Sequence, residues 1–132
     1  MPLYALGDVS PQIDPDAFVH PEATIIGNVV IGPQSTIWPQ AVLRGDQSRI
    51  VIGARTSIQD GTVAHTTPAT PTTVGDECVI GHLVHLVAGR VHAGEVRSRG
   101  EGRFAEDARY DGMGPRPRAA AGTGRGSARV GG

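Results

Sequence analysis

The sequence has no lysine, a single cysteine (Cys78), and aromatic residues at only 4% of its 132 positions. One cysteine excludes an internal disulfide and fits a reducing compartment. No apolar run approaches the roughly 18 residues that span a membrane, and the first residues lack the basic flank and apolar stretch of a signal peptide. The formal net charge of −1 provides no long-range attraction to nucleic acid or anionic membranes. These absences favour a cytoplasmic protein that binds neither nucleic acid nor membrane.

The composition changes abruptly near residue 86. Residues 1–86 carry three arginines and eight acidic residues, a charge of −5, together with 24 Ile, Leu and Val residues. Residues 87–132 carry nine arginines and five acidic residues, a charge of +4, with eleven glycines and only four aliphatic residues of these types. Such a segment buries too little apolar surface to offset an ordering entropy of about 1–2 kcal/mol per residue.

We therefore predict a folded domain over residues 1–86 and a disordered, low-complexity Arg/Gly-rich tail over residues 87–132. The sudden loss of Ile and Leu is also what a shifted reading frame produces, and the tail is interpreted as a non-native extension of this kind. On this interpretation the folded domain is a truncated one.

Within residues 1–86, aliphatic residues recur at every sixth position, and a small residue follows four positions behind most of them. The aliphatic series is Ile13, Val19, Ile25, Ile31, Ile37 and Leu43, then Ile52, Ile58 and Ala64, then Val74, Ile80 and Leu86. The small series is Ala17, Ala23, Val29, Ser35 and Ala41, then Thr56 and Thr62, then Cys78 and Val84. Neither the helical period of 3.6 nor simple alternation produces this pattern.

A period of six with one aliphatic and one small residue is typical of the hexapeptide β-helix, in which three hexads form one triangular coil. The pattern thus predicts an all-β fold, a parallel β-helix over about residues 10–86. Its coils stack at about 4.8 Å. Both series point inward, so Cys78 is predicted to be a core residue rather than a nucleophile. Two shifts of register predict loops at residues 47–51 and 66–73, where the walls of a site can be built.

Three histidines carry the strongest candidate chemistry. His65 and His85 are predicted to point outward from one face, one coil apart, and His82 lies at a neighbouring corner. Stacked imidazoles can converge on zinc, which takes three protein nitrogens at about 2.0–2.1 Å and keeps a fourth position open in catalytic sites. The alternative is that these are solvated surface histidines, and His20 and His92 are assigned to that class.

Three motifs also carry a resemblance to a known family. Residues 43–46 (LRGD), 58–65 (IQDGTVAH) and 74–82 (VGDECVIGH) together resemble the γ-class carbonic anhydrases, whose relatives include phenylacetate-pathway and ferripyochelin-binding hexapeptide proteins. The resemblance covers about residues 10–86. It implies a left-handed β-helix, a homotrimer with zinc at the subunit interface (iron or cobalt being the alternatives), and reversible hydration of carbon dioxide to bicarbonate.

The same resemblance implies roles for individual residues. It makes His65 a metal ligand from one subunit and His82 a ligand from the neighbouring subunit. Gln59 becomes the catalytic residue that hydrogen-bonds the water on the metal. An interface ion-pair network is implied for Arg44, Asp46 and Asp60.

The family's third ligand corresponds to Val87, which cannot bind a metal. His85 is the nearest substitute on the same outward face, and two strand residues displace it by about 6–7 Å. Two other functions therefore stay open. One is acyl transfer to or from coenzyme A, or a related thioesterase reaction, with a single histidine as general base. The other is a non-catalytic trimeric scaffold or binding protein that retains the fold.

Overall fold

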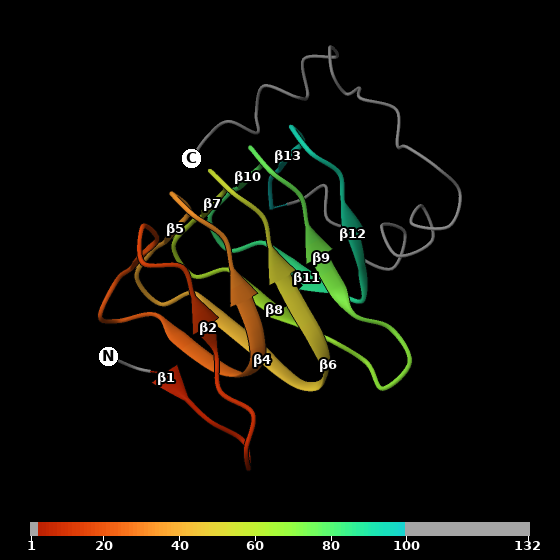
Figure 1. Cartoon of the computed structure of the whole chain (residues 1–132). Helices are drawn as coiled ribbons and strands as arrows, with labels where there is room; N and C mark the ends of the chain where they lie inside the picture. Colours follow the sequence, from red (N-terminus) through yellow and green to blue (C-terminus); the bar gives the residue numbers. More distant parts are fainter. Residues whose placement is uncertain (1–2, 100–132) are drawn as a thin grey trace.

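The computed structural model describes residues 3–99, which form a left-handed parallel β-helix of about five turns (Figure 1). Its strands are β1 (Leu3–Tyr4), β2 (Gln12–Ile13), β3 (Phe18–Val19), β4 (Thr24–Ile31), β5 (Thr36–Ile37), β6 (Val42–Ile52), β7 (Ser57–Ile58), β8 (Val63–His65), β9 (Thr72–Val74), β10 (Val79–Ile80), β11 (His85–Val87), β12 (Gly89–Val91) and β13 (Val96–Arg97). Over this described range there is no helix of the length and apolarity needed to cross a membrane.

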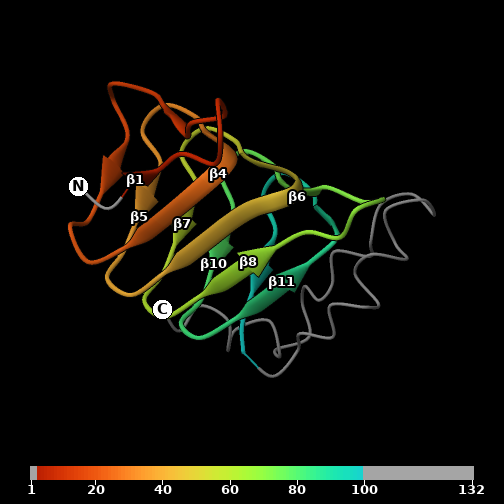
Figure 2. The ribbon, with the colours of Figure 1, turned by 90° about the horizontal axis from the view of Figure 1, so that it is seen from below.

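The strands line three faces of a triangular prism. The long strands β4 and β6 bend around one edge, so each contributes to two faces. The first face holds β2, the second halves of β4 and β6, β9 and β12, and the second face holds β3, β5, β7, β10 and β13. The third face holds β1, the first halves of β4 and β6, β8 and β11, which lie side by side in Figure 2. All of these pairings are parallel, as the hexad pattern predicts.

The core consists of the two inward series. Eleven of the twelve predicted aliphatic positions are buried, and Ile13 packs against them half-buried at the first coil. The prism is narrow, so the second series must be small, and its members from Ala23 onward are buried as well. Burial of apolar surface contributes about 25 cal/mol per Å², which makes this column of aliphatic residues the main source of stability.

Buried hydroxyl groups in the small series bond to the next coil. Ser35 Oγ donates to Gly53 O at 2.6 Å, Thr56 Oγ1 donates to Gly75 O at 2.7 Å, and Thr62 Oγ1 donates to Gly81 O at 2.9 Å. The glycine carbonyls of one coil thereby satisfy the hydroxyls of the coil before it. A buried hydroxyl without such a partner costs about 1–3 kcal/mol, so this ladder explains why Ser and Thr are tolerated inside an apolar prism.

Cys78 continues the same ladder. Its Sγ lies 3.1 Å from His92 O, and the residue is 1% exposed. The pKa of the Cys78 thiol is raised, mainly because the thiol is buried. The thiol therefore stays protonated at neutral pH. This agrees with the predicted core role.

The thiol of Cys78 is expected to resist modification in the folded protein, because a neutral, buried thiol is a poor nucleophile. A chromogenic disulfide reagent at pH 8 is expected to label Cys78 only after denaturant is added. Labelling of the folded protein at the rate of a free thiol would contradict the burial described here.

The two loops in the structure are shorter than those predicted from the sequence. Ile50 is fully buried and pairs with Thr72, so the last two residues of each predicted loop belong to the strands of the prism instead. The bulges are confined to about residues 46–49 and 66–71. Ser48 N donates to Thr66 Oγ1 at 2.9 Å, which ties the two bulges together beside His65.

The β-helix also extends past its predicted end at residue 86. Strand β12 pairs with β9, and strand β13 pairs with β10 in register with Ile80. Val91 is 3% exposed, while Glu95 and Arg97, at 9% and 2%, occupy the small and aliphatic positions of this coil. A buried ion pair between Arg97 Nη2 and Glu95 Oε1, 3.0 Å apart, replaces the apolar contacts that the pattern requires. The boundary at residue 86 was therefore wrong for residues 87–99, and residues 100–132 of the predicted tail lie outside the described residues.

Candidate functional site

His65 and His85 come together on the third face. They lie on the neighbouring strands β8 and β11, whose inward residues Ala64 and Leu86 belong to the core. Their Nε2 atoms are 3.2 Å apart, and the two rings stack with centroids 5.2 Å apart and an interplanar angle of 29°. Val87, and not His85, is in direct register with His65, as predicted. His85 is displaced along the strand from the position in register with His65, but the two rings are oriented so that their Nε2 atoms still come close together.

The spacing of these two nitrogens fits a metal. Two nitrogens at about 2.0–2.1 Å from a tetrahedral zinc lie about 3.3 Å apart, close to the 3.2 Å observed between His65 and His85. His65 Nδ1 lies 3.4 Å from Thr66 O. A proton on Nδ1 can therefore donate to this carbonyl, leaving a lone pair on Nε2 for the metal.

Burial lowers the pKa of His85, and the neighbouring His65 lowers it further. A lowered pKa means that the imidazole is neutral at pH 7, which is the form that can bind a metal. His85 thus offers a ring nitrogen with a lone pair.

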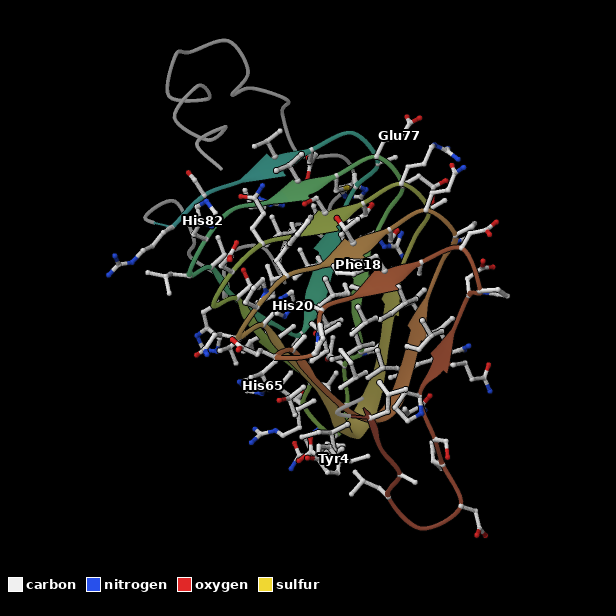
Figure 3. All side chains as sticks on the ribbon, turned by 90° about the vertical axis from the view of Figure 1, so that its left-hand side faces the viewer. Tyr4, Phe18, His20, His65, Glu77 and His82 are labelled. Atoms are coloured by element: carbon white, nitrogen blue, oxygen red, sulfur yellow. The ribbon has the colours of Figure 1, made fainter. Side chains whose placement is uncertain are left out.

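His82 lies at the corner that follows β10, on the edge between the second and third faces. In Figure 3, His82 and His65 lie on the same side of the view, and Glu77 lies on the other. His82 Nδ1 is 3.3 Å from Asp60 Oδ1, and both side chains are about half exposed, at 51% and 52%. His82 thus has a carboxylate partner of its own and does not meet the pair formed by His65 and His85.

No three potential ligand side chains converge within one copy of residues 3–99. Two nitrogens of the predicted set meet in this chain, and the third is presented outward at an edge of the prism. This arrangement is the one expected if a three-nitrogen site needs His82 from a second copy.

The predicted ion-pair residues are only partly joined in this chain. Arg44 Nε lies 3.5 Å from Asp46 Oδ2, and Arg44 is in register with His65 on the third face. Asp60 contacts His82 instead. The network of all three residues across an interface stays a prediction.

Gln59 follows strand β7, and its backbone N–H donates to Ile80 O at 2.9 Å. Its side-chain Oε1 is buried and has no hydrogen-bond partner. A buried acceptor left unsatisfied costs about 1–3 kcal/mol, and such groups in native proteins occur where a bound group or water supplies the missing donor. Gln59 is therefore an available acceptor one residue from Asp60.

The structure corrects the prediction that His92 is a solvated surface histidine. His92 was assigned to the solvated surface histidines, but its Nε2 atom is buried without a hydrogen-bond partner. It lies in the last described coil, which was not recognised in the sequence. The Asp60–His82 contact was also missed, and the signal that could have found it is their spacing of one coil at the same corner.

The described fold is a parallel β-helix built from hexapeptide repeats. Residues 10–45 match the family described as bacterial transferase hexapeptide (six repeats). Among solved structures, the chain is similar to a hexapeptide transferase family protein from Anaplasma phagocytophilum, with a TM-score of 0.64 and 43% identity over 67% of this chain and 51% of that one. It is also similar to a putative acetyltransferase from Bacillus cereus, with a TM-score of 0.51 and 25% identity over 74% of each chain.

The chain is also similar to two curated proteins. The chain is 44% identical over 81 residues to the mitochondrial gamma carbonic anhydrase 2 of Arabidopsis thaliana, a match that covers 57% of this chain and 29% of that protein. It is 44% identical over 82 residues to the carnitine operon protein CaiE of Escherichia coli O157:H7, covering 62% of this chain and 42% of that one. The chain thus spans less than half the length of these two relatives. The resemblance to γ-carbonic anhydrase-like hexapeptide proteins is confirmed by these matches.

Proposed function

We propose that this chain is a γ-carbonic anhydrase-like enzyme that hydrates carbon dioxide reversibly at a metal site shared between two copies. His65 and His85 supply two nitrogens from one copy, and His82 supplies the third from its neighbour. The observation that carries the proposal is the separation of 3.2 Å between His65 Nε2 and His85 Nε2. The outward position of His82 at an edge supports a closed ring of copies, and the proposed assembly is a homotrimer.

A set of three imidazoles favours zinc, with iron or cobalt as the alternatives. When bound, the metal supplies Lewis acidity, which makes water acidic enough to serve as a nucleophile near neutral pH. The chain's own residues have the remaining roles, which are to hold the metal, to bind a group in the site and to join the copies. The three imidazoles would bind and orient the metal, Gln59 Oε1 accepts a hydrogen bond from a group in the site, and the Arg44–Asp46 pair contributes to the contact between copies.

The first test is the metal content of protein purified without a histidine tag. We expect close to one zinc per chain in the wild type and loss of nearly all of it in His65→Ala, because the variant removes one of three donors. The matched control is His20→Ala, since His20 uses its Nδ1 only to accept from Glu22 N at 2.9 Å. Carbon dioxide hydration is then assayed on both variants. A folded wild-type assembly without bound metal would contradict the proposal.

A second candidate is acyl transfer to or from coenzyme A, as the names of the hexapeptide transferase relatives indicate for those proteins. The observation that favours it is the contact between His82 Nδ1 and Asp60 Oδ1, 3.3 Å apart, because a carboxylate-oriented histidine is the usual general base. Acetyl-coenzyme A turnover that survives a chelator and is lost in His82→Ala would favour this candidate. A folded assembly with neither activity would favour the non-catalytic scaffold, and the cytoplasmic location stays a prediction.

A further inference from the structure

The contact between Asp60 and His82 joins two consecutive coils at one edge of the prism. Asp60 follows strand β7 and His82 follows strand β10, which pair in register through Ile58 and Ile80. The backbone N–H of Leu83 donates to Asp60 O at 2.9 Å, so the two corners are stacked by their own backbone. The contact between the side chains is therefore built into the repeat and does not depend on a flexible loop.

Both corners need unusual backbone conformations to stack in this way. Leu83 has a φ of 60° and Gly61 has a φ of 73°. A non-glycine residue in this region is strained and keeps the conformation only where the surrounding structure holds it. The stacked corner holds Leu83 in that conformation, directly after His82, and this leaves the His82 side chain beside Asp60.

The carboxylate of Asp60 decides which ring nitrogen of His82 carries the proton. With Nδ1 at 3.3 Å from Oδ1, a proton on Nδ1 faces a carboxylate oxygen, whereas a lone pair on Nδ1 would face it with repulsion. Arg44 does not compete for this carboxylate within the chain, because its Nε contacts Asp46 Oδ2 at 3.5 Å. Nε2 is then left with the lone pair.

We propose that Asp60 is a positioning residue that fixes the Nδ1–H tautomer of His82, so that His82 Nε2 is presented as a ligand to the metal held by His65 and His85 of a neighbouring copy. This rests on the proposed function above. A metal-binding histidine in proteins almost always donates its other ring N–H to a carboxylate, a carbonyl or water. His65 has the same arrangement, with the Thr66 carbonyl 3.4 Å from its Nδ1.

The first experiment measures the tautomer directly in metal-free protein. Long-range ¹H–¹⁵N correlation spectra of histidine-labelled protein at pH 8, where an ordinary imidazole is neutral, report which nitrogen of His82 is protonated. We expect Nδ1–H in the wild type and in Asp60→Asn, whose amide oxygen still accepts. In Asp60→Ala, we expect a shift to the Nε2–H form, which free imidazole side chains prefer. Asp16→Ala is the control, since Asp16 is exposed at another edge.

The second experiment measures zinc affinity by competition with a chelator. Loss of an outer-shell partner typically lowers metal affinity by about 10- to 100-fold, and we expect a loss of this size in Asp60→Ala, a smaller loss in Asp60→Asn and none in Asp16→Ala. The backbone amide spectrum of each variant verifies that the prism is folded.

The two experiments separate two kinds of failure. An unchanged His82 tautomer in folded Asp60→Ala overturns the role of Asp60, even if the wild type binds one zinc per chain. A tautomer shift in a protein that binds no zinc supports the Asp60–His82 contact and overturns the metal site of the proposed function. A tautomer shift together with the expected loss of affinity supports both.

Discussion

Replacing His85 with alanine is expected to lower the zinc affinity of the assembled protein by at least about 100-fold, and adding Val87→His to that variant is expected to restore it. The first change removes a nitrogen that lies 3.2 Å from His65 Nε2. Outer-shell partners alone are worth about 10- to 100-fold in affinity, so loss of a direct ligand costs at least the upper end of that range.

Restoration by Val87→His follows from the register. Val87 is paired with His65 across the parallel strands β8 and β11, and its side chain is only half-buried. Neighbours in such a ladder are about 4.8 Å apart, so an imidazole at position 87 stacks directly on His65 and can share one metal with it. The nitrogen lost with His85 is thereby replaced by one that lies two residues further along the same strand.

The measurement is a chelator competition titration of the wild type, His85→Ala and His85→Ala/Val87→His. His20→Ala serves as the matched control, because it removes an imidazole outside the His65–His85 pair. Retention of wild-type affinity in folded His85→Ala would show that this residue is not a metal ligand. Failure of the double variant to regain metal would contradict the register argument.

Arg97→Ala is expected to destabilise the protein by about 3–5 kcal/mol, the range for removing one partner of a buried ion pair. Arg97 is 2% exposed and its Nη2 lies 3.0 Å from Glu95 Oε1, so the change leaves a carboxylate buried at the end of the prism without this partner. Arg97→Ala also opens a cavity at a position that every earlier coil fills with an aliphatic side chain.

The double variant Glu95→Ala/Arg97→Leu is expected to be as stable as the wild type, or more stable by about 1–4 kcal/mol. It places a small and an aliphatic residue at the two inward positions, and apolar replacement of a buried ion pair is often stabilising by this amount. Denaturant titration at fixed protein concentration measures both effects, because assembly makes the apparent stability concentration-dependent. Equal stability of all three proteins would mean that this coil unfolds before the rest of the prism.

The order of the residues alone specifies most of the prism. One aliphatic residue in every six, followed by a small one, has a single compact solution, because only a narrow triangular coil turns the same two positions of each hexad inward. The predicted core from Val19 to Leu86 and the core position of Cys78 are confirmed for this reason. The resemblance of residues 43–46, 58–65 and 74–82 to the γ-class carbonic anhydrases was likewise evident from the sequence alone.

The last coil could not be read from the pattern. Val91 follows Leu86 by five positions instead of six, and the next inward positions hold Glu95 and Arg97. A hydropathy pattern predicts that two charged residues lie on the surface. In the structure, strands β12 and β13 pair with β9 and β10, and this pairing directs Glu95 and Arg97 inward, where they form an ion pair with each other. Stacking on an existing coil therefore overrides composition at this end of the prism.

For the candidate site, too, the sequence determines some features and the tertiary structure determines the others. Spacing within the hexads determines that His65 and His85 point outward from one face and that Asp60 and His82 share a corner. Tertiary structure decided how far each side chain reaches. The stacked rings of His65 and His85 bring their Nε2 atoms to 3.2 Å, and a corner held at positive φ brings His82 to Asp60. Sequence periodicity specifies the face and the coil of a residue, while the position of a ring nitrogen depends on side-chain torsions that only the packed molecule sets.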